Sequence, residues 1–201
     1  MNDTAKTVEF LFDVVSPTAY IAYRRLPEIA ARTGATIVWT PVFLGGIMQA
    51  TGNSPPGKLP AKGKYMNRDL ERCAARYGIP FAHNAHFPFN SLTIQRAAVS
   101  ILDREGAPAL IRFLDACFRA AWVDDKNLGD AGVVAQVLEA AGFDAQDLAA
   151  RAADPRYKNK LKANSDDAVA RGVFGAPTFF VGDEMFFGQD RLDYVEEALA
   201  A

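Results

Sequence analysis

A serine hydroxyl, that of Ser16, stands where a predicted strand gives way to a predicted helix. The apolar run Val8–Phe12 precedes it and a helical pattern follows it. Ser16 therefore suits the N-cap position, and Pro17 suits the first helical position, where a missing N–H costs nothing. A helix start carries free amide donors and partial positive charge, so a hydroxyl there can donate a hydrogen bond to a bound anion. For a Ser-Pro pair taken alone, a purely structural helix cap is the simpler interpretation.

The histidines and cysteines of the chain do not form a second candidate site. His83 and His86 are the two histidines, but no nearby Cys, Asp or Glu completes a metal coordination set, so we expect loop residues and no metal. Neither lies near Ser16 in sequence, which leaves a Ser-His-Asp triad without support. Cys73 and Cys117 lie far apart in helical patterns, as expected of small buried apolar residues rather than a redox pair.

A basic, glycine- and proline-rich segment spans residues 45–64. It contains Lys58, Lys62 and Lys64 and no acidic residue, and it is predicted to be a loop after a short helical start. A solvated basic loop is the simpler interpretation of the charge. The alternative is a loop that faces an anion and closes over a site.

The first third of the chain predicts a β-α-β unit. Residues 7–13 and 36–43 form strand patterns, and residues 17–33 form a helical pattern that Pro27 should kink and Gly34 should end. Such a unit favours a parallel strand pair.

The rest of the chain predicts a block of helices and then a hairpin. A helix is expected at 65–77 and an extended aromatic-rich connection at 78–90. The helices expected after it are 91–104, 107–122, 130–140, 144–152 and 158–172. A hairpin with its turn at Gly182-Asp183 follows, and Gln189-Asp190 opens a final helix with Leu192, Val195 and Leu199 inward.

A β-α-β start and a β-β-α end around a block of helices predict an α/β thioredoxin-like fold with a helical insertion. We expect the thioredoxin-like domain in residues 1–48 and 174–201. The inserted all-helical domain, with a substrate-side loop, should occupy residues 49–173.

Composition narrows the function classes. The formal net charge of −2 disfavours nucleic-acid binding. No apolar run reaches the roughly 20 residues of a membrane span, and the start Met1–Lys6 lacks the apolar core of a signal peptide. We therefore expect a cytoplasmic protein with no membrane partner.

Short motifs along the whole chain give a resemblance. They are Phe12-Asp13-Val14-Val15-Ser16-Pro17, Gly52-Asn53-Ser54-Pro55-Pro56-Gly57, Lys62-Gly63-Lys64-Tyr65-Met66, Tyr77-Gly78-Ile79-Pro80, Val173-Phe174-Gly175-Ala176-Pro177-Thr178 and Phe187-Gly188-Gln189-Asp190-Arg191-Leu192. With these motifs in this order, the chain resembles the family of 2-hydroxychromene-2-carboxylate isomerases and kappa-class glutathione transferases. That resemblance implies a DsbA-like thioredoxin fold, glutathione as cofactor and a homodimer.

The resemblance also implies residue roles. Ser16 would be the catalytic residue, donating to the sulfur of glutathione and favouring the thiolate over a thiol whose ordinary pKa is about 8.5. Ser16-Pro17-Thr18-Ala19 takes the place of Cys-x-x-Cys, so no catalytic disulfide can form. The predicted cofactor-binding residues are Ser16, Pro17, Thr18, Asn53, Lys62, Ala176 beside a cis proline, Phe187, Gly188, Gln189 and Asp190. The predicted substrate-side residues are Asn53, Lys62, Phe87 and Phe89.

The activity that the resemblance implies is the glutathione-dependent interconversion of 2-hydroxychromene-2-carboxylate and trans-o-hydroxybenzylidenepyruvate, in aromatic hydrocarbon catabolism. One alternative is a kappa-like transferase that conjugates or reduces an electrophile. Another is a non-catalytic module that binds thiol peptides in the same groove. A disulfide oxidoreductase is disfavoured because the chain has no Cys-x-x-Cys.

Overall fold

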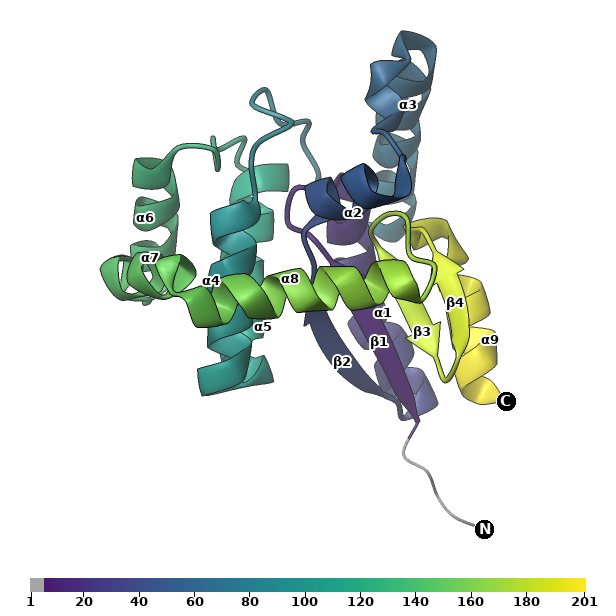
Figure 1. Ribbon diagram of the computed structural model, residues 1–201. Coiled ribbons are helices and arrows are strands. Elements are labelled where there is room, and N and C mark those ends of the chain that lie inside the picture. Colours follow the sequence, from purple (N-terminus) through teal and green to yellow (C-terminus); the bar gives the residue numbers. More distant parts are fainter. Residues whose placement is uncertain (1–5) are drawn as a thin grey trace.

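The computed structural model describes residues 6–201, so the predicted lack of a signal peptide in Met1–Lys6 concerns residues almost all outside the described range (Figure 1). The strands are β1 (Thr7–Phe12), β2 (Thr36–Pro41), β3 (Thr178–Val181) and β4 (Glu184–Phe187). The helices are α1 (Pro17–Thr33), α2 (Leu44–Thr51), α3 (Pro60–Tyr77), α4 (Leu92–Glu105), α5 (Ala107–Trp122), α6 (Ala131–Ala140), α7 (Ala145–Ala153), α8 (Pro155–Ala170) and α9 (Leu192–Ala200), with 3₁₀ turns η1 (Pro56–Lys58) and η2 (Gln189–Arg191).

One four-stranded sheet, in the order β2-β1-β3-β4, carries the fold. β1 and β2 are parallel, as the β-α-β pattern predicts, with Thr7 opposite Thr36. β3 lies antiparallel to β1, and β4 lies antiparallel to β3. The sheet thus joins the two ends of the chain, and the helical block projects from between them (Figure 1).

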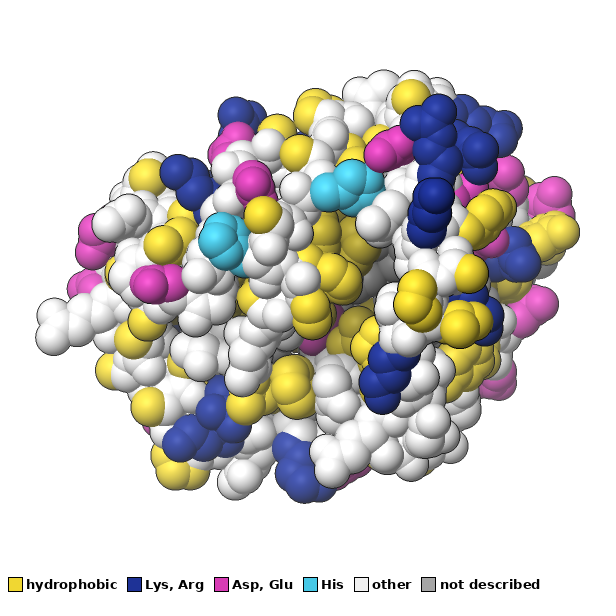
Figure 2. All heavy atoms as spheres, turned by 90° about the horizontal axis from the view of Figure 1, so that it is seen from above, with side chains coloured by type: hydrophobic (Ala, Val, Ile, Leu, Met, Phe, Trp, Pro, Cys, Tyr) yellow, Lys and Arg dark blue, Asp and Glu magenta, His cyan; other side chains and the backbone are white. Residues whose placement is uncertain are grey.

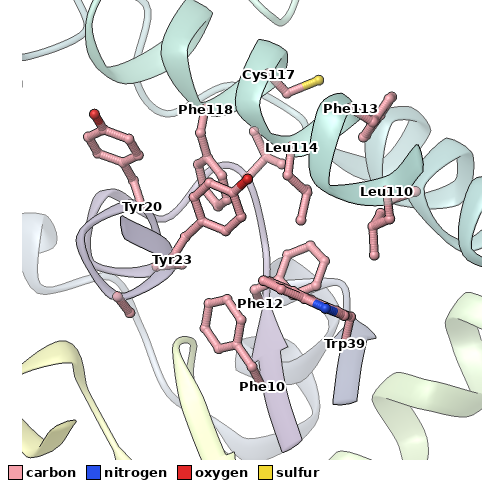
Figure 3. Close-up of a cluster of buried hydrophobic side chains, with 14 of the residues drawn as sticks. Phe10, Phe12, Tyr20, Tyr23, Trp39, Leu110, Phe113, Leu114, Cys117 and Phe118 are labelled. Atoms are coloured by element: carbon pink, nitrogen blue, oxygen red, sulfur yellow. The ribbon is translucent and has the colours of Figure 1, made fainter. Parts of the chain in front are cut away.

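Alternation along β1 divides its side chains between two helical layers. Phe10 and Phe12 point to the face covered by α1, α5 and α9, where α5 contributes Phe118 and Leu114 to the same cluster (Figure 3). The Phe10 and Phe179 rings stack with centroids 5.3 Å apart. Because strand side chains alternate, Leu11 points to the opposite face, where it packs with residues of α2 and α8.

The helices agree with the predicted ones except at some starts. α3 begins at Pro60 rather than at residue 65, and α8 begins at Pro155 rather than at residue 158. Both prolines occupy the first helical turn, where proline needs no N–H partner, so each starts a helix that we had expected to begin later. Lys62 and Lys64 consequently lie on α3, and the prediction that they belong to a loop is wrong. α1 continues through Pro27 and ends at Gly34, whose φ is +70°.

The final hairpin has its turn at Gly182-Asp183, as predicted, and Leu192, Val195 and Leu199 of α9 are buried. Within residues 6–201, no helix combines the length and apolar character that crossing a membrane requires. The predicted DsbA-like arrangement, a thioredoxin sheet with inserted helices, is confirmed.

Candidate functional site

Ser16 caps α1 as the sequence predicts. Its φ of −87° and ψ of 115° are extended, its side chain accepts from the Ala19 amide at 3.2 Å, and Pro17 follows in the first turn. The hydroxyl is buried, and no histidine of the described chain is bonded to it. It is a hydrogen-bond donor at a helix start.

The Ser16 hydroxyl also joins α1 to the loop before β3. It donates to the Ala176 carbonyl at 2.9 Å and lies 2.9 Å from the Thr18 hydroxyl. The Ala176-Pro177 bond is cis, as the resemblance implied. Two segments 160 residues apart in sequence therefore meet at this hydroxyl.

Gln189 and Asp190, at the start of the last helical segment, have different surroundings. Gln189 is buried: its amide nitrogen donates to the Cys73 sulfur at 3.7 Å, while its Oε1 has no hydrogen-bond partner. Asp190 is exposed and pairs with Arg191 at 2.8 Å. Cys73 is half-buried and packs against the core, so the expectation that it is buried is wrong. Cys117 is buried, as expected, and burial raises its pKa.

Asn53 and Phe187 both contact the segment before the cis proline. The Asn53 side-chain amide donates to the Phe174 carbonyl at 2.8 Å. The Phe174 ring lies 4.5 Å from the Phe187 ring, and a Cβ at Gly175 would come within 2.7 Å of the Phe187 ring. A glycine at 175 is therefore required for Phe187 to pack there. Gly188, between Phe187 and Gln189, has a φ of +99°.

Lys62 lines an open hollow of about 570 Å³ together with Asn53, Ser54 and Tyr65. Figure 2 looks toward the end of the sheet where β1 ends; it shows a hollow with a largely hydrophobic floor and lysine and arginine side chains gathered on the α3 side. Lys62 is exposed.

The predicted substrate-side aromatics are not equivalent. Phe87 is 47% exposed, whereas Phe89 is 7% exposed and belongs to the core, and both rings lie near the Trp122 ring. The exposed surface of this pair is therefore that of Phe87. The Phe87-Pro88 bond is also cis, a feature that we did not predict.

His83 and His86 lie in the extended connection, as expected. His83 Nε2 lies 3.0 Å from Glu71 on α3. Nowhere in residues 6–201 do three His, Cys, Asp or Glu side chains gather as a metal site would require.

Asp13 and Trp122, which hydrogen-bond to the segment just before Ser16, were not predicted from the sequence. The buried Asp13 carboxylate accepts from the amides of Val15 and Leu44, and burial raises the pKa of Asp13 to about 6. The Trp122 indole donates to the Val14 carbonyl at 2.9 Å. An acidic residue directly after a buried strand was the signal that could have revealed Asp13.

Comparison with known proteins shows the family to which the chain belongs. Residues 7–200 match the model of the DSBA-like thioredoxin domain. The chain is 34% identical to 2-hydroxychromene-2-carboxylate isomerase of Sphingobium xenophagum, covering 96% of this chain and 98% of the relative. It is 28% identical to human glutathione S-transferase kappa 1, covering 99% and 93%.

A solved structure of a 2-hydroxychromene-2-carboxylate isomerase superimposes with a TM-score of 0.84 at 30% identity, covering 96% of this chain and 94% of that one. The fold, the nearly complete coverage and the relatives above 30% identity all indicate the same family. The chain therefore belongs to the DSBA-like thioredoxin domain family, in the branch that contains the 2-hydroxychromene-2-carboxylate isomerases.

Proposed function

We propose that this protein is a glutathione-dependent isomerase that interconverts 2-hydroxychromene-2-carboxylate and trans-o-hydroxybenzylidenepyruvate. Relatives with this name match over nearly their whole length. The observation that carries the proposal is the buried Ser16 hydroxyl, which takes the place of a redox cysteine at the start of α1 and faces the Ala176 loop.

The residues present fit glutathione. Ser16 offers a donor beside the positive end of α1, which suits a thiolate. Gln189 has a buried oxygen without a partner, and Asp190, the next residue, has an exposed carboxylate. We propose that the two residues hold the γ-glutamyl end, with Asp190 facing its ammonium. Lys62 offers a cation for a carboxylate. We propose that Ala176 and Pro177 border the cysteinyl part, and that Pro17, Thr18, Phe187 and Gly188 complete the wall.

When bound, glutathione supplies a thiolate that can add to the conjugated double bond of the substrate, allow rotation about the resulting single bond, and then be eliminated unchanged. The residues of this chain stabilise the thiolate and bind the substrate. Ser16 lowers the free energy of the thiolate by donating to it, and we propose that the exposed Phe87 ring and the Lys62 ammonium contact the aromatic carboxylate substrate.

Turnover of the chromene with and without glutathione tests the proposal. We expect no turnover without glutathione. In the Ser16→Ala variant, loss of a hydrogen bond to a charged group, worth about 1.5–3 kcal/mol, should lower kcat/KM about 10- to 100-fold. The apparent pKa of the thiol limb in the pH–rate profile should rise. Turnover that is independent of glutathione would end the isomerase hypothesis, and full activity of Ser16→Ala would remove Ser16 from it.

A kappa-like transferase is the second candidate. It is favoured by the relatives of that name and by the glycine- and proline-rich stretch at residues 52–64. Conjugation of a chlorodinitrobenzene-type electrophile by the protein, abolished in Ser16→Ala, would favour this activity. Binding of glutathione without turnover of either substrate would indicate a thiol-peptide binding module instead.

Three further predictions come from the sequence and the resemblance. We propose a homodimer, a cytoplasmic location and no nucleic-acid partner. Light scattering after size exclusion measures the first, and fractionation of the source cells the second.

A further inference from the structure

A buried carboxylate lies directly below the candidate site. Asp13 has no exposed surface and follows the last residue of β1. Its Oδ1 accepts from the Val15 amide at 3.1 Å, and its backbone carbonyl accepts from the Ser16 amide at 3.0 Å. The residue therefore holds the turn that ends in the Ser16 hydroxyl.

The other carboxylate oxygen binds a second element. Asp13 Oδ2 accepts from the amide of Leu44, the first residue of α2, at 2.9 Å. The N-cap residue of α2, Phe43, has no side chain that caps the helix. Asp13 thus supplies an acceptor for one of the amides at this helix start that have no partner within the helix. Asn53 follows the other end of α2, so one carboxylate binds both the Ser16 turn and the helix that precedes Asn53.

The groups around Asp13 are polar but uncharged. Ser91, the N-cap residue of α4, is buried, and its hydroxyl lowers the pKa of Asp13. α4 also contributes Gln95, whose amide donates to the Phe12 and Val42 carbonyls at 2.8 Å. Burial outweighs these bonds and raises the pKa of Asp13 to about 6, and no charged side chain of residues 6–201 contributes to that shift.

We propose that Asp13 is a positioning residue whose ionised carboxylate fixes the Ser16 turn to the start of α2. Both oxygens of a carboxylate are full acceptors, whereas protonation converts one of them into a donor. Protonation therefore weakens one of the two amide bonds and loosens Ser16 relative to Asn53. This inference rests on the proposed function for its consequence, weaker glutathione binding in acid, but not for its structural content.

Amide NMR of the unsubstituted protein tests the structural content. The Val15 and Leu44 amide resonances should shift with a common midpoint near pH 6, together with the Asp13 side-chain carboxyl carbon. As a control for the two histidines of the chain, the measurement is repeated with His83 and His86 both replaced by asparagine. Amides that do not move between pH 5 and pH 8, or that move only when the histidines are present, would overturn the proposal.

The consequence is tested by glutathione calorimetry on the unsubstituted protein and on Asp13→Asn, which keeps the shape but cannot ionise. For the unsubstituted protein, we expect the affinity for glutathione to fall about tenfold from pH 7 to pH 5. For Asp13→Asn, we expect a low affinity that does not change between these pH values. Equal pH dependence in both would overturn the role of Asp13. If glutathione binds neither protein at any pH, the proposed function fails, while the NMR titration still decides whether Asp13 controls the turn.

Discussion

At the scale of single residues, the Ser16 hydroxyl already has an acceptor. It donates to the Ala176 carbonyl, so a bound sulfur must replace that carbonyl as its partner. The Thr18 hydroxyl lies 3.5 Å from the same carbonyl oxygen and 2.9 Å from Ser16. Thr18 is thus placed to donate to Ala176 when Ser16 turns away, which keeps the buried carbonyl satisfied in both arrangements.

Gln189 gives a residue-scale prediction because its buried Oε1 has no partner. An unpaired buried polar atom destabilises a fold by about 1–3 kcal/mol, so Gln189→Met, which keeps the length, should unfold at equal or higher temperature. The same variant should bind glutathione about tenfold more weakly, since the proposed acceptor for the γ-glutamyl end is lost.

Thermal unfolding and calorimetry measure the two effects of Gln189→Met. The matched control is Gln136→Met on the exposed side of α6, which should change neither quantity. A loss of stability in Gln189→Met without loss of affinity would assign this glutamine to the fold alone.

At the scale of elements, α3 carries the basic side of the hollow. Lys62→Met should raise the KM for the carboxylate substrate about two- to fivefold and leave kcat nearly unchanged. The reason is that an exposed charge contributes only about 0.2–1 kcal/mol to the free energy of an ion pair. The effect should shrink as salt rises. Steady-state kinetics at low and high salt measure it, with Lys160→Met on the exposed side of α8 as the control. A kcat effect larger than the KM effect would contradict this role.

The same elements show what the sequence could and could not predict. β1, α1 and the last hairpin follow from apolar periodicity, the Ser16-Pro17 start and the Gly182-Asp183 turn, because these are local signals. The start of α3 was placed too late because the glycines and lysines around Pro60 suggested a loop, although Pro60 suits a first helical turn. Pairings between distant segments, such as Asp13 with Leu44 and Gln189 with Cys73, depend on packing that no local pattern contains.

At the scale of the whole molecule, Asp13 makes stability depend on pH with an unusual sign. Its pKa of about 6 in the fold exceeds the ordinary 3.8, so the native state holds this proton more tightly than the unfolded chain does. Its contribution is therefore fully present below about pH 4 and is lost as pH rises through 6, by at most about 3 kcal/mol. The ionised Asp13 carboxylate, which binds the amides of Val15 and Leu44, thus lowers the free energy of unfolding at neutral pH.

Urea unfolding of the unsubstituted protein and of Asp13→Asn between pH 4 and pH 8 measures this dependence. The difference in free energy of unfolding between them should move in favour of Asp13→Asn as pH rises, and other titrating groups cancel in the comparison. A constant difference would show that Asp13 has the same pKa in both states.

The contrast between the two cysteines has a practical consequence for labelling. Cys117 is enclosed by the core, whereas Cys73 is half-buried against the Gln189 amide. A maleimide added to the native protein should therefore alkylate one position, at the edge where we place the γ-glutamyl group. Glutathione bound beside Gln189 should shield that sulfur, so the rate of alkylation of Cys73 would report binding without any engineered thiol.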